Sequence, residues 1–131
     1  MRIEHVAMYV NDIERSKDFF VKYFGAVAGE KYHNFRSGFT SYFLTFGSGA
    51  RLEIMQRPSM SDAPKGTYRT GFHHMAICVG NGSSVDKVTE RLRNDGYLIA
   101  NGPRWTGDDM YAAVVVDQEG NEIEILAEPG K

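Results

Sequence analysis

The chain has little cysteine, little proline and no excess of charge of either sign. Its 131 residues include one cysteine and four prolines, and 15 lysine and arginine residues nearly balance 17 aspartate and glutamate residues. A single cysteine, Cys78, excludes an intramolecular disulfide. The balanced charge leaves no broad positive surface for nucleic acid or anionic lipid. These absences favour small molecules as the binding partners.

Long hydrophobic runs are absent as well. No segment combines a basic start with an apolar stretch long enough for a signal peptide, and none is long enough to span a membrane. We therefore expect a cytoplasmic protein. A content of 42% hydrophobic and 12% aromatic residues is enough for a chain of this length to bury the core of a single domain, residues 1–131.

The second half of the chain repeats the first. HVAMYV (5–10) matches HMAICV (74–79), and both segments show the alternation of a half-buried strand. YFLTFGSGARLEIM (42–55) matches AVVVDQEGNEIEIL (113–126), each typical of two strands joined at a glycine-containing turn.

The stretch between the repeats, about 58–71, has the composition of a loop. The sequence therefore predicts one module at about 1–57, a linker, and a second module at about 72–131.

A helix follows the first strand of each module. Asp12 can cap the first helix and Gly25 can end it, while Ser83, with Asp86 at capping-box spacing, can cap the second, which Gly96 ends. A third, weaker strand is expected around 30–37 in the first module and around 97–105 in the second. Each module is then βαβββ, which gives eight strands and two helices. We predict an α+β fold in which two tandem modules form a curved mixed sheet with a cleft on its concave side.

Four residues occupy equivalent positions in the two modules. His5 and His74 begin the first strands, and Glu53 and Glu124 lie in the last strands, each flanked by apolar residues that point to the opposite face. A single histidine or glutamate on a strand is usually structural or solvated. The repetition of both residue types is harder to explain in that way, because a carboxylate among apolar neighbours is costly unless it is exposed, paired or bound to a cation.

Two imidazoles and two carboxylates are suitable ligands for one divalent ion with open coordination positions. Such a donor set favours nickel, zinc, cobalt, manganese or iron over calcium. A site of this kind can stabilise an oxyanion while a carboxylate moves a proton.

Three segments of the sequence resemble the vicinal oxygen chelate superfamily, and within it the bacterial glyoxalase I-type proteins. They are IEHVAMYVNDIERSKDFFVKYFG near the start, FHHMAICV in the middle, and VVVDQEGNEIEIL near the end, where Asp117 to Glu124 resembles the family pattern D-x-x-G-N-x-x-E. The resemblance covers essentially the whole chain. It implies a glyoxalase fold, and it implies a homodimer.

The resemblance also implies a reaction. The metal ligands of the glyoxalase I type fall on His5, Glu53, His74 and Glu124. The expected reaction converts the hemithioacetal of a 2-oxoaldehyde and a thiol into a 2-hydroxyacyl thioester, with Glu124 as the base and Glu53 as its pseudo-symmetric partner. Tyr9 and Arg57 stand where the glutathione-dependent enzymes often have an arginine and an asparagine, so the identity of the thiol stays open.

Further residues are candidates for substrate contact. Arg36 and Arg57 could bind a carboxylate or a phosphate. Trp105 and Tyr111 belong to a segment that is either a loop over the cleft or a plain turn between core aromatics. Cys78 could face the cleft, but packing is a better interpretation than nucleophilic catalysis.

Other functions are compatible with the same pattern. One alternative is a different metalloenzyme of this superfamily, either a thiol transferase of the fosfomycin-resistance type or an epimerase. The thiol transferases usually carry a His, His, Glu set, so a fourth ligand at Glu53 argues against them. Another alternative is a metal-free module that binds a drug, which the complete set of four ligands disfavours.

Overall fold

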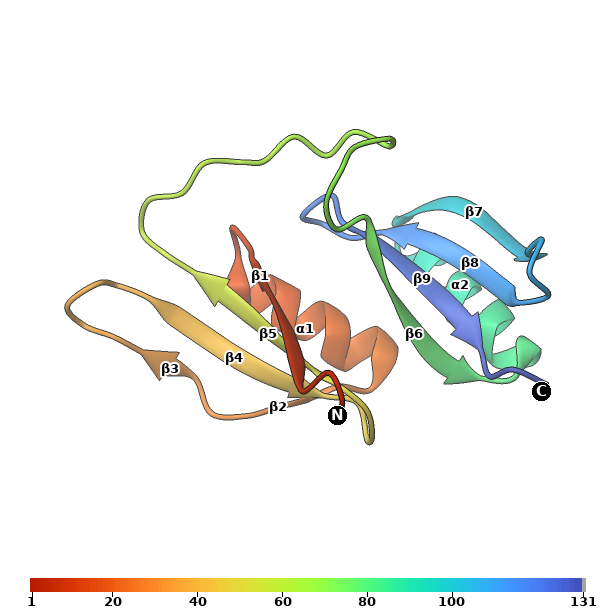
Figure 1. The fold of residues 1–131 in the computed structure, drawn as a ribbon, viewed down its shortest axis with the longest axis horizontal. Coiled ribbons are helices and arrows are strands. Elements are labelled where there is room, and N and C mark those ends of the chain that lie inside the picture. The colour runs from red at the N-terminus through yellow and green to blue at the C-terminus, as the bar shows by residue number, and fades with distance from the viewer. Residues whose placement is uncertain (131) are drawn as a thin grey trace. The chain divides into compact units, whose positions relative to one another are not determined.

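The computed structural model describes residues 1–130 and divides into two compact units (Figure 1). The first unit is Met1–Ala63, and the second begins at Pro64. This boundary lies inside the stretch expected to be a linker. Among the described residues, no helix is both long enough and apolar enough to cross a membrane.

The first unit contains one helix and five short strands. In chain order these are β1 (His5–Tyr9), α1 (Ile13–Phe24), β2 (Val27–Ala28), β3 (Tyr32–His33), β4 (Thr40–Thr45) and β5 (Arg51–Gln56). The strands are arranged β1-β5-β4-β2, with β3 also paired to β4. β1 runs parallel to β5, while the other pairs are antiparallel, so the sheet is mixed.

Helix α1 packs against one face of this sheet (Figure 1). It begins and ends as predicted, because the side chain of Asp12 accepts a hydrogen bond from the backbone N–H of Arg15, and Gly25 adopts a left-handed conformation with φ 65°. Phe20 of the helix and Leu44 and Ile54 of the sheet are fully buried. Burial of these side chains stabilises the unit and leaves the opposite face of the sheet without a helix.

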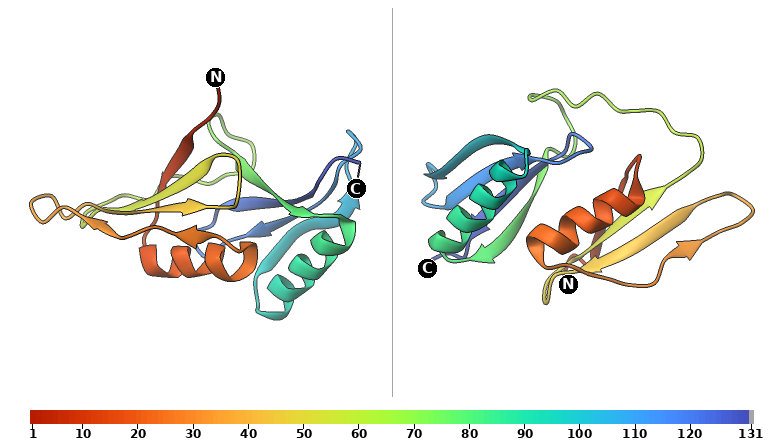
Figure 2. Two further views of the ribbon diagram at one scale, coloured as in Figure 1. Left: turned by 90° about the horizontal axis from the view of Figure 1, so that it is seen from below. Right: turned by 180° about the vertical axis from the view of Figure 1, so that it is seen from behind.

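The second unit repeats this arrangement. It consists of β6 (His74–Gly80), α2 (Gly82–Asn94), β7 (Leu98–Trp105), β8 (Tyr111–Val116) and β9 (Glu122–Ala127). The strand order is β6-β9-β8-β7, with β6 parallel to β9 and the remaining pairs antiparallel. Helix α2 packs against one face of this sheet (Figure 2). The predicted α+β class is therefore confirmed, with one helix and one mixed sheet in each unit.

The start of α2 differs from the prediction. Asn81, and not Ser83, is the capping residue, and its side chain accepts a hydrogen bond of 3.0 Å from the N–H of Ser84. Asn81 has extended backbone angles, whereas Ser83 already lies in the first helical turn. Both residue types are good caps, so composition alone did not distinguish them.

The strand count of the first unit also differs from the prediction. The described residues contain nine strands and not eight, because the segment after α1 pairs with β4 twice, as β2 and as β3. Val27 and Ala28 pair with Thr45 and Leu44, and pairing resumes only at Tyr32 and Ser41. The chain thus advances by four residues from Ala28 while β4 advances by three, and this extra residue interrupts the ladder.

Candidate metal centre

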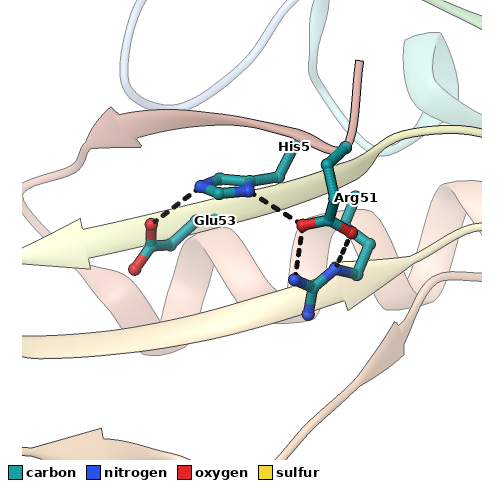
Figure 3. Close-up of polar contacts among 4 residues, drawn as sticks. His5, Arg51 and Glu53 are labelled. Atoms are coloured by element: carbon teal, nitrogen blue, oxygen red, sulfur yellow. Dashed lines mark hydrogen bonds and ion pairs between the residues drawn. The ribbon is translucent and has the colours of Figure 1, made fainter. Parts of the chain in front are cut away.

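His5 and Glu53 lie on the face of the first sheet that α1 does not cover. In the parallel ladder His5 pairs with Arg51 and Ala7 pairs with Glu53, so these side chains share one face. Leu52 and Ile54 point to the helix and are 3% and 0% exposed. The Nε2 atom of His5 lies 3.9 Å from a carboxylate oxygen of Glu53 (Figure 3). Strand alternation therefore brings together two candidate ligands that are far apart in sequence.

His74 and Glu124 have the same relationship in the second unit. His74 pairs with Glu122 and Ala76 pairs with Glu124, in the same parallel register as the first unit. Ile123 and Ile125, which flank Glu124, are fully buried on the helix side. Both units thus present one histidine and one glutamate on the face opposite the helix.

A turn stabilised by side-chain to backbone hydrogen bonds precedes the strand that contains Glu124. The carboxylate of Asp117 accepts hydrogen bonds from the backbone N–H groups of Glu119 (2.9 Å) and Asn121 (2.8 Å), and Gly120 has φ 81°. Burial raises the pKa of the Asp117 carboxyl, partly offset by the hydrogen bonds from Asn121 and Glu119. This is the local reason why the D-x-x-G-N-x-x-E segment forms a turn followed by a strand.

Glu4 and Arg51 lie beside His5, and no sequence motif marks either of them. Glu4 accepts two hydrogen bonds from the guanidinium of Arg51, at 2.9 and 2.6 Å, and its Oε1 lies 2.9 Å from Nδ1 of His5. The hydrogen bonds from Arg51 and then from His5 lower the pKa of Glu4 to about 2. The carboxylate of Glu4 is therefore ionised across the physiological range.

A comparable arrangement exists beside His74. The Nδ1 atoms of His73 and His74 are 2.8 Å apart, and Nε2 of His73 lies 3.2 Å from a carboxylate oxygen of Glu122. Strand alternation predicts that His73 points away from His74, but His73 precedes the first residue of β6, where alternation no longer applies. The two imidazoles are consequently in contact.

Tyr9 and Arg57 form a polar pair at the end of β1. Nε of Arg57 donates a hydrogen bond of 3.0 Å to the hydroxyl of Tyr9, and its guanidinium carbon lies 5.1 Å from the centre of the Phe39 ring. Tyr9 alternates onto the same face as His5. The guanidinium is thus held by an aromatic ring and a hydroxyl, and within residues 1–130 no carboxylate forms a salt bridge with it.

The candidates Trp105 and Tyr111 lie at the end of β7 and at the start of β8 in the second unit. Tyr111 alternates with Ala113 onto the helix side, where its hydroxyl donates a hydrogen bond of 2.5 Å to Asp86 of α2. Trp105 packs against Tyr111, with the ring centres 5.4 Å apart. Tyr111 therefore links β8 to α2.

Arg36 lies in a turn and Cys78 lies on a strand, and both residues are exposed. The backbone N–H of Arg36 donates to the side chain of Asn34 in the exposed turn between β3 and β4. Cys78 is exposed on β6, and partial burial with the nearby carboxylate of Glu128 raises the pKa of its thiol. A raised thiol pKa does not favour a nucleophilic role.

Residues 2–125 match the family model of the Glyoxalase/Bleomycin resistance protein/Dioxygenase superfamily. The chain belongs to this superfamily. It is 26% identical over 129 residues to an uncharacterized protein of Bacillus subtilis, YqjT, covering 95% of this chain and 98% of YqjT. It is 25% identical over 130 residues to lactoylglutathione lyase of Escherichia coli, covering 98% of this chain and 93% of the lyase.

Solved structures of other superfamily members have the same fold. The trypanothione-dependent glyoxalase I of Leishmania major is 24% identical with a TM-score of 0.78, covering 98% of this chain and 87% of that enzyme. The fosfomycin resistance protein FosX of Mesorhizobium loti is 18% identical with a TM-score of 0.70, covering 98% and 92% of the two chains. The fold is thus common to members with different chemistry, and the site residues must decide between them.

The donor atoms on the open faces fit a divalent metal ion in chemical type. Imidazole nitrogen and carboxylate oxygen are the ligands expected for nickel, zinc, cobalt or manganese. Among the described residues, no group of three or more His, Cys, Asp or Glu side chains lies close enough together to hold a metal ion. Within its own sheet, each unit presents one histidine and one glutamate on the face without a helix.

Proposed function

We propose that this protein is a divalent-metal-dependent lyase of the glyoxalase I type. The substrate would be the hemithioacetal of a 2-oxoaldehyde and a thiol, and the product a 2-hydroxyacyl thioester. One observation carries the proposal: each unit presents a histidine and a glutamate in the same register on the face without a helix. Similarity to lactoylglutathione lyase over nearly the whole chain supports it.

His5, Glu53, His74 and Glu124 are the proposed ligands of one divalent ion. A nickel, zinc, cobalt or manganese ion held by them would supply positive charge that stabilises negative charge on the substrate oxygens. The two histidines would bind through a ring nitrogen, and the two glutamates through carboxylate oxygens. The side chain of Glu53 is only 16% exposed, which limits the water that competes for it.

The reaction needs one proton to move between neighbouring carbon atoms and a second proton to move from the hydroxyl oxygen to the former carbonyl oxygen. A carboxylate takes the proton from the carbon that bears the hydroxyl and the sulfur, and then returns it to the adjacent carbonyl carbon. No atom is gained or lost. We assign this role to Glu124, with Glu53 as its counterpart. Their register partners Ala76 and Ala7 have small side chains, which leave space beside each carboxylate.

Glutamine substitutions test the proposal. Glu53→Gln and Glu124→Gln keep the size of the side chain but cannot accept a proton. We expect a loss of turnover of about 10²–10⁴-fold in the variant that lacks the base, and weaker metal binding in both. Glu90→Gln is the matched control, because Glu90 is an exposed carboxylate on α2 paired with Arg93. Full activity in both test variants would contradict the proposal.

A substrate panel separates this function from the alternatives. Purified protein, loaded with each metal in turn, is offered hemithioacetals of glutathione and of other thiols, and also an epoxide antibiotic with a thiol. Epoxide opening without hemithioacetal turnover would favour the fosfomycin-resistance type of chemistry. Racemisation at a carbon next to a carbonyl would favour an epimerase, and tight drug binding without metal would favour a binding module.

A homodimer with a small-molecule substrate, and a cytoplasmic location, belong to the same proposal. They derive from the resemblance to the glyoxalase I-type proteins. Sedimentation analysis of the purified protein would measure the assembly state directly.

A further inference from the structure

A neutral histidine can offer a metal only the ring nitrogen that carries no proton. Which nitrogen that is depends on the hydrogen bond made by the other one. In metal sites a neighbouring carboxylate or carbonyl usually accepts from the second nitrogen and so selects the tautomer. In this structure Nδ1 of His5 lies against the carboxylate of Glu4, and Nδ1 of His74 lies against a ring nitrogen of His73.

In the first unit the neighbour of His5 is Glu4. Arg51 donates two hydrogen bonds to Glu4, so the carboxylate is ionised and acts only as an acceptor. Its contact of 2.9 Å with Nδ1 of His5 therefore requires a proton on Nδ1. In the neutral ring, Nε2 then carries the lone pair, and it is Nε2 that faces Glu53.

In the second unit the series of contacts contains one more residue, from Glu122 through His73 to His74. Nε2 of His73 lies 3.2 Å from a carboxylate oxygen of Glu122, and this contact favours a proton on Nε2, which leaves Nδ1 of His73 without a proton in the neutral ring. This Nδ1 lies 2.8 Å from Nδ1 of His74 and must accept from it. His74 is therefore protonated on Nδ1, and its Nε2 carries the lone pair.

The two units reach this result with unlike residues. Glu4 and His73 each precede the histidine ligand, while Arg51 and Glu122 are the register partners of the two ligands. In the first unit the carboxylate belongs to Glu4, which directly precedes the first strand, and in the second unit it belongs to Glu122, in the last strand. Copying of one module alone would have produced the same residues in both.

Phe43 packs against both His5 and Arg51, the two residues that contact Glu4. Its ring contacts His5 edge-on, with the ring centres 5.3 Å apart, and the guanidinium carbon of Arg51 lies 4.1 Å from the centre of the same ring. Because the side chain of His5 is 41% exposed, packing by itself constrains the ring only in part. The contact with Glu4 therefore also helps to orient the ring.

We propose that Glu4, and His73 together with Glu122, are positioning residues that keep His5 and His74 in the Nδ1-protonated tautomer, so that each Nε2 is free to bind the metal. This inference rests on the proposed metal-dependent function. It assigns no step of the reaction to Glu4, His73 or Glu122, which act through the neighbouring histidines.

Nitrogen NMR of the metal-free protein tests the proposal directly. Long-range hydrogen–nitrogen spectra of protein labelled in its histidines, recorded where the rings are neutral, distinguish the two tautomers. The resonances are assigned with single His→Gln variants. We expect Nδ1–H signatures for His5 and His74 in the wild type. Glu4→Ala should shift His5 towards the Nε2–H form that free histidine prefers, and Glu122→Ala should do the same for His74.

Metal affinity provides the second measurement. Each variant should bind zinc and nickel about 10–100-fold more weakly than the wild type in a competition titration. Glu4→Gln keeps an oxygen that accepts from Nδ1 and should retain more of the affinity than Glu4→Ala. Glu90→Ala removes an arginine-paired surface carboxylate of α2 and should change neither readout.

Two results would overturn the positioning role. One is an Nε2–H tautomer of His5 or His74 in the wild type, and the other is an unchanged tautomer and affinity in both alanine variants. Turnover has no part in these readouts. A wild type without hemithioacetal turnover that still shows the expected tautomers and affinity losses would contradict the lyase function while supporting the positioning role.

Discussion

The Nε2 atom of His5 lies 3.9 Å from a carboxylate oxygen of Glu53, on the face of the sheet that α1 leaves open. This separation is longer than a hydrogen bond, so the imidazole of His5 and the carboxylate of Glu53 are not hydrogen-bonded to each other. Both side chains stay available to a third group. The parallel ladder between β1 and β5 determines this relationship. It pairs His5 with Arg51, two residues before Glu53, so that His5 and Glu53 lie on the same face of neighbouring strands.

Arg57 is expected to recognise a negative charge on the substrate. Its guanidinium is oriented by Tyr9 and Phe39. Arg57→Ala should raise KM for a substrate that carries a carboxylate about 10–100-fold, the equivalent of one charge-assisted hydrogen bond, with a smaller change in kcat. Steady-state kinetics with charged and neutral thiols measures this. Arg93→Ala on α2 is the control, and an equal KM in both variants would exclude the role.

Tyr42 is expected to make stability depend on pH in alkaline solution. Its hydroxyl donates to both carboxylate oxygens of Glu14, at 2.5 and 2.9 Å, and this hydrogen bond raises the pKa of Tyr42 from 10.0 to about 12. The folded state therefore binds the proton more tightly than the unfolded state. The contribution to stability is complete below pH 10 and is lost as the pH rises towards 12.

Tyr42→Phe should remove this alkaline dependence and lower the free energy of unfolding at pH 8 by about 1 kcal/mol. Urea denaturation at pH 8 and at pH 11 gives both values. Tyr68→Phe is the matched control, because Tyr68 is fully exposed. A Tyr42→Phe variant with the same loss of stability between the two pH values as the wild type would refute the interpretation.

The isoleucines at equivalent core positions should be about equally important. Ile54 and Ile125 each follow a proposed ligand glutamate and are fully buried. Ile54→Ala and Ile125→Ala should each lower the free energy of unfolding by about 2–5 kcal/mol. Ile3→Ala, at a position 68% exposed, should have a small effect. Denaturant unfolding monitored by circular dichroism provides the comparison, and a cost near that of Ile3→Ala would be incompatible with the predicted core.

Gly102 is expected to tolerate no side chain. It has φ 75°, and a Cβ atom there would lie 2.5 Å from the backbone oxygen of Ala112. Gly102→Ala should cost at least about 1–2 kcal/mol from the left-handed backbone, with the steric overlap in addition. At Gly107 a Cβ atom would meet nothing within 4 Å, so Gly107→Ala is the control. Melting temperatures of the two variants test this, and equal values would argue against the strain.

The duplication and the faces of the strands could be predicted from the sequence. Strand alternation depends only on the backbone, so the separation of Glu53 and Glu124 from their isoleucine neighbours follows from the order of residues. The cap at Asp12 and the stop at Gly25 are equally local. The family follows from motifs that extend over the whole chain, and residues 2–125 match its model.

The cap at Asn81 and the break between β2 and β3 could not be predicted. Asn81 competes with Ser83 for the same role, and the helix geometry decides between them. The break depends on the register against β4, which involves residues distant in the sequence.

The sequence by itself determined which residue types recur and on which side of a strand they lie, because both are properties of local backbone geometry. Only the tertiary structure decided that Glu4 contacts His5, that His73 contacts His74 and that Tyr111 points to α2. These contacts depend on side-chain rotamers and on the pairing of distant strands. A one-dimensional pattern contains neither, so the partners of the histidines appear only once the chain has folded.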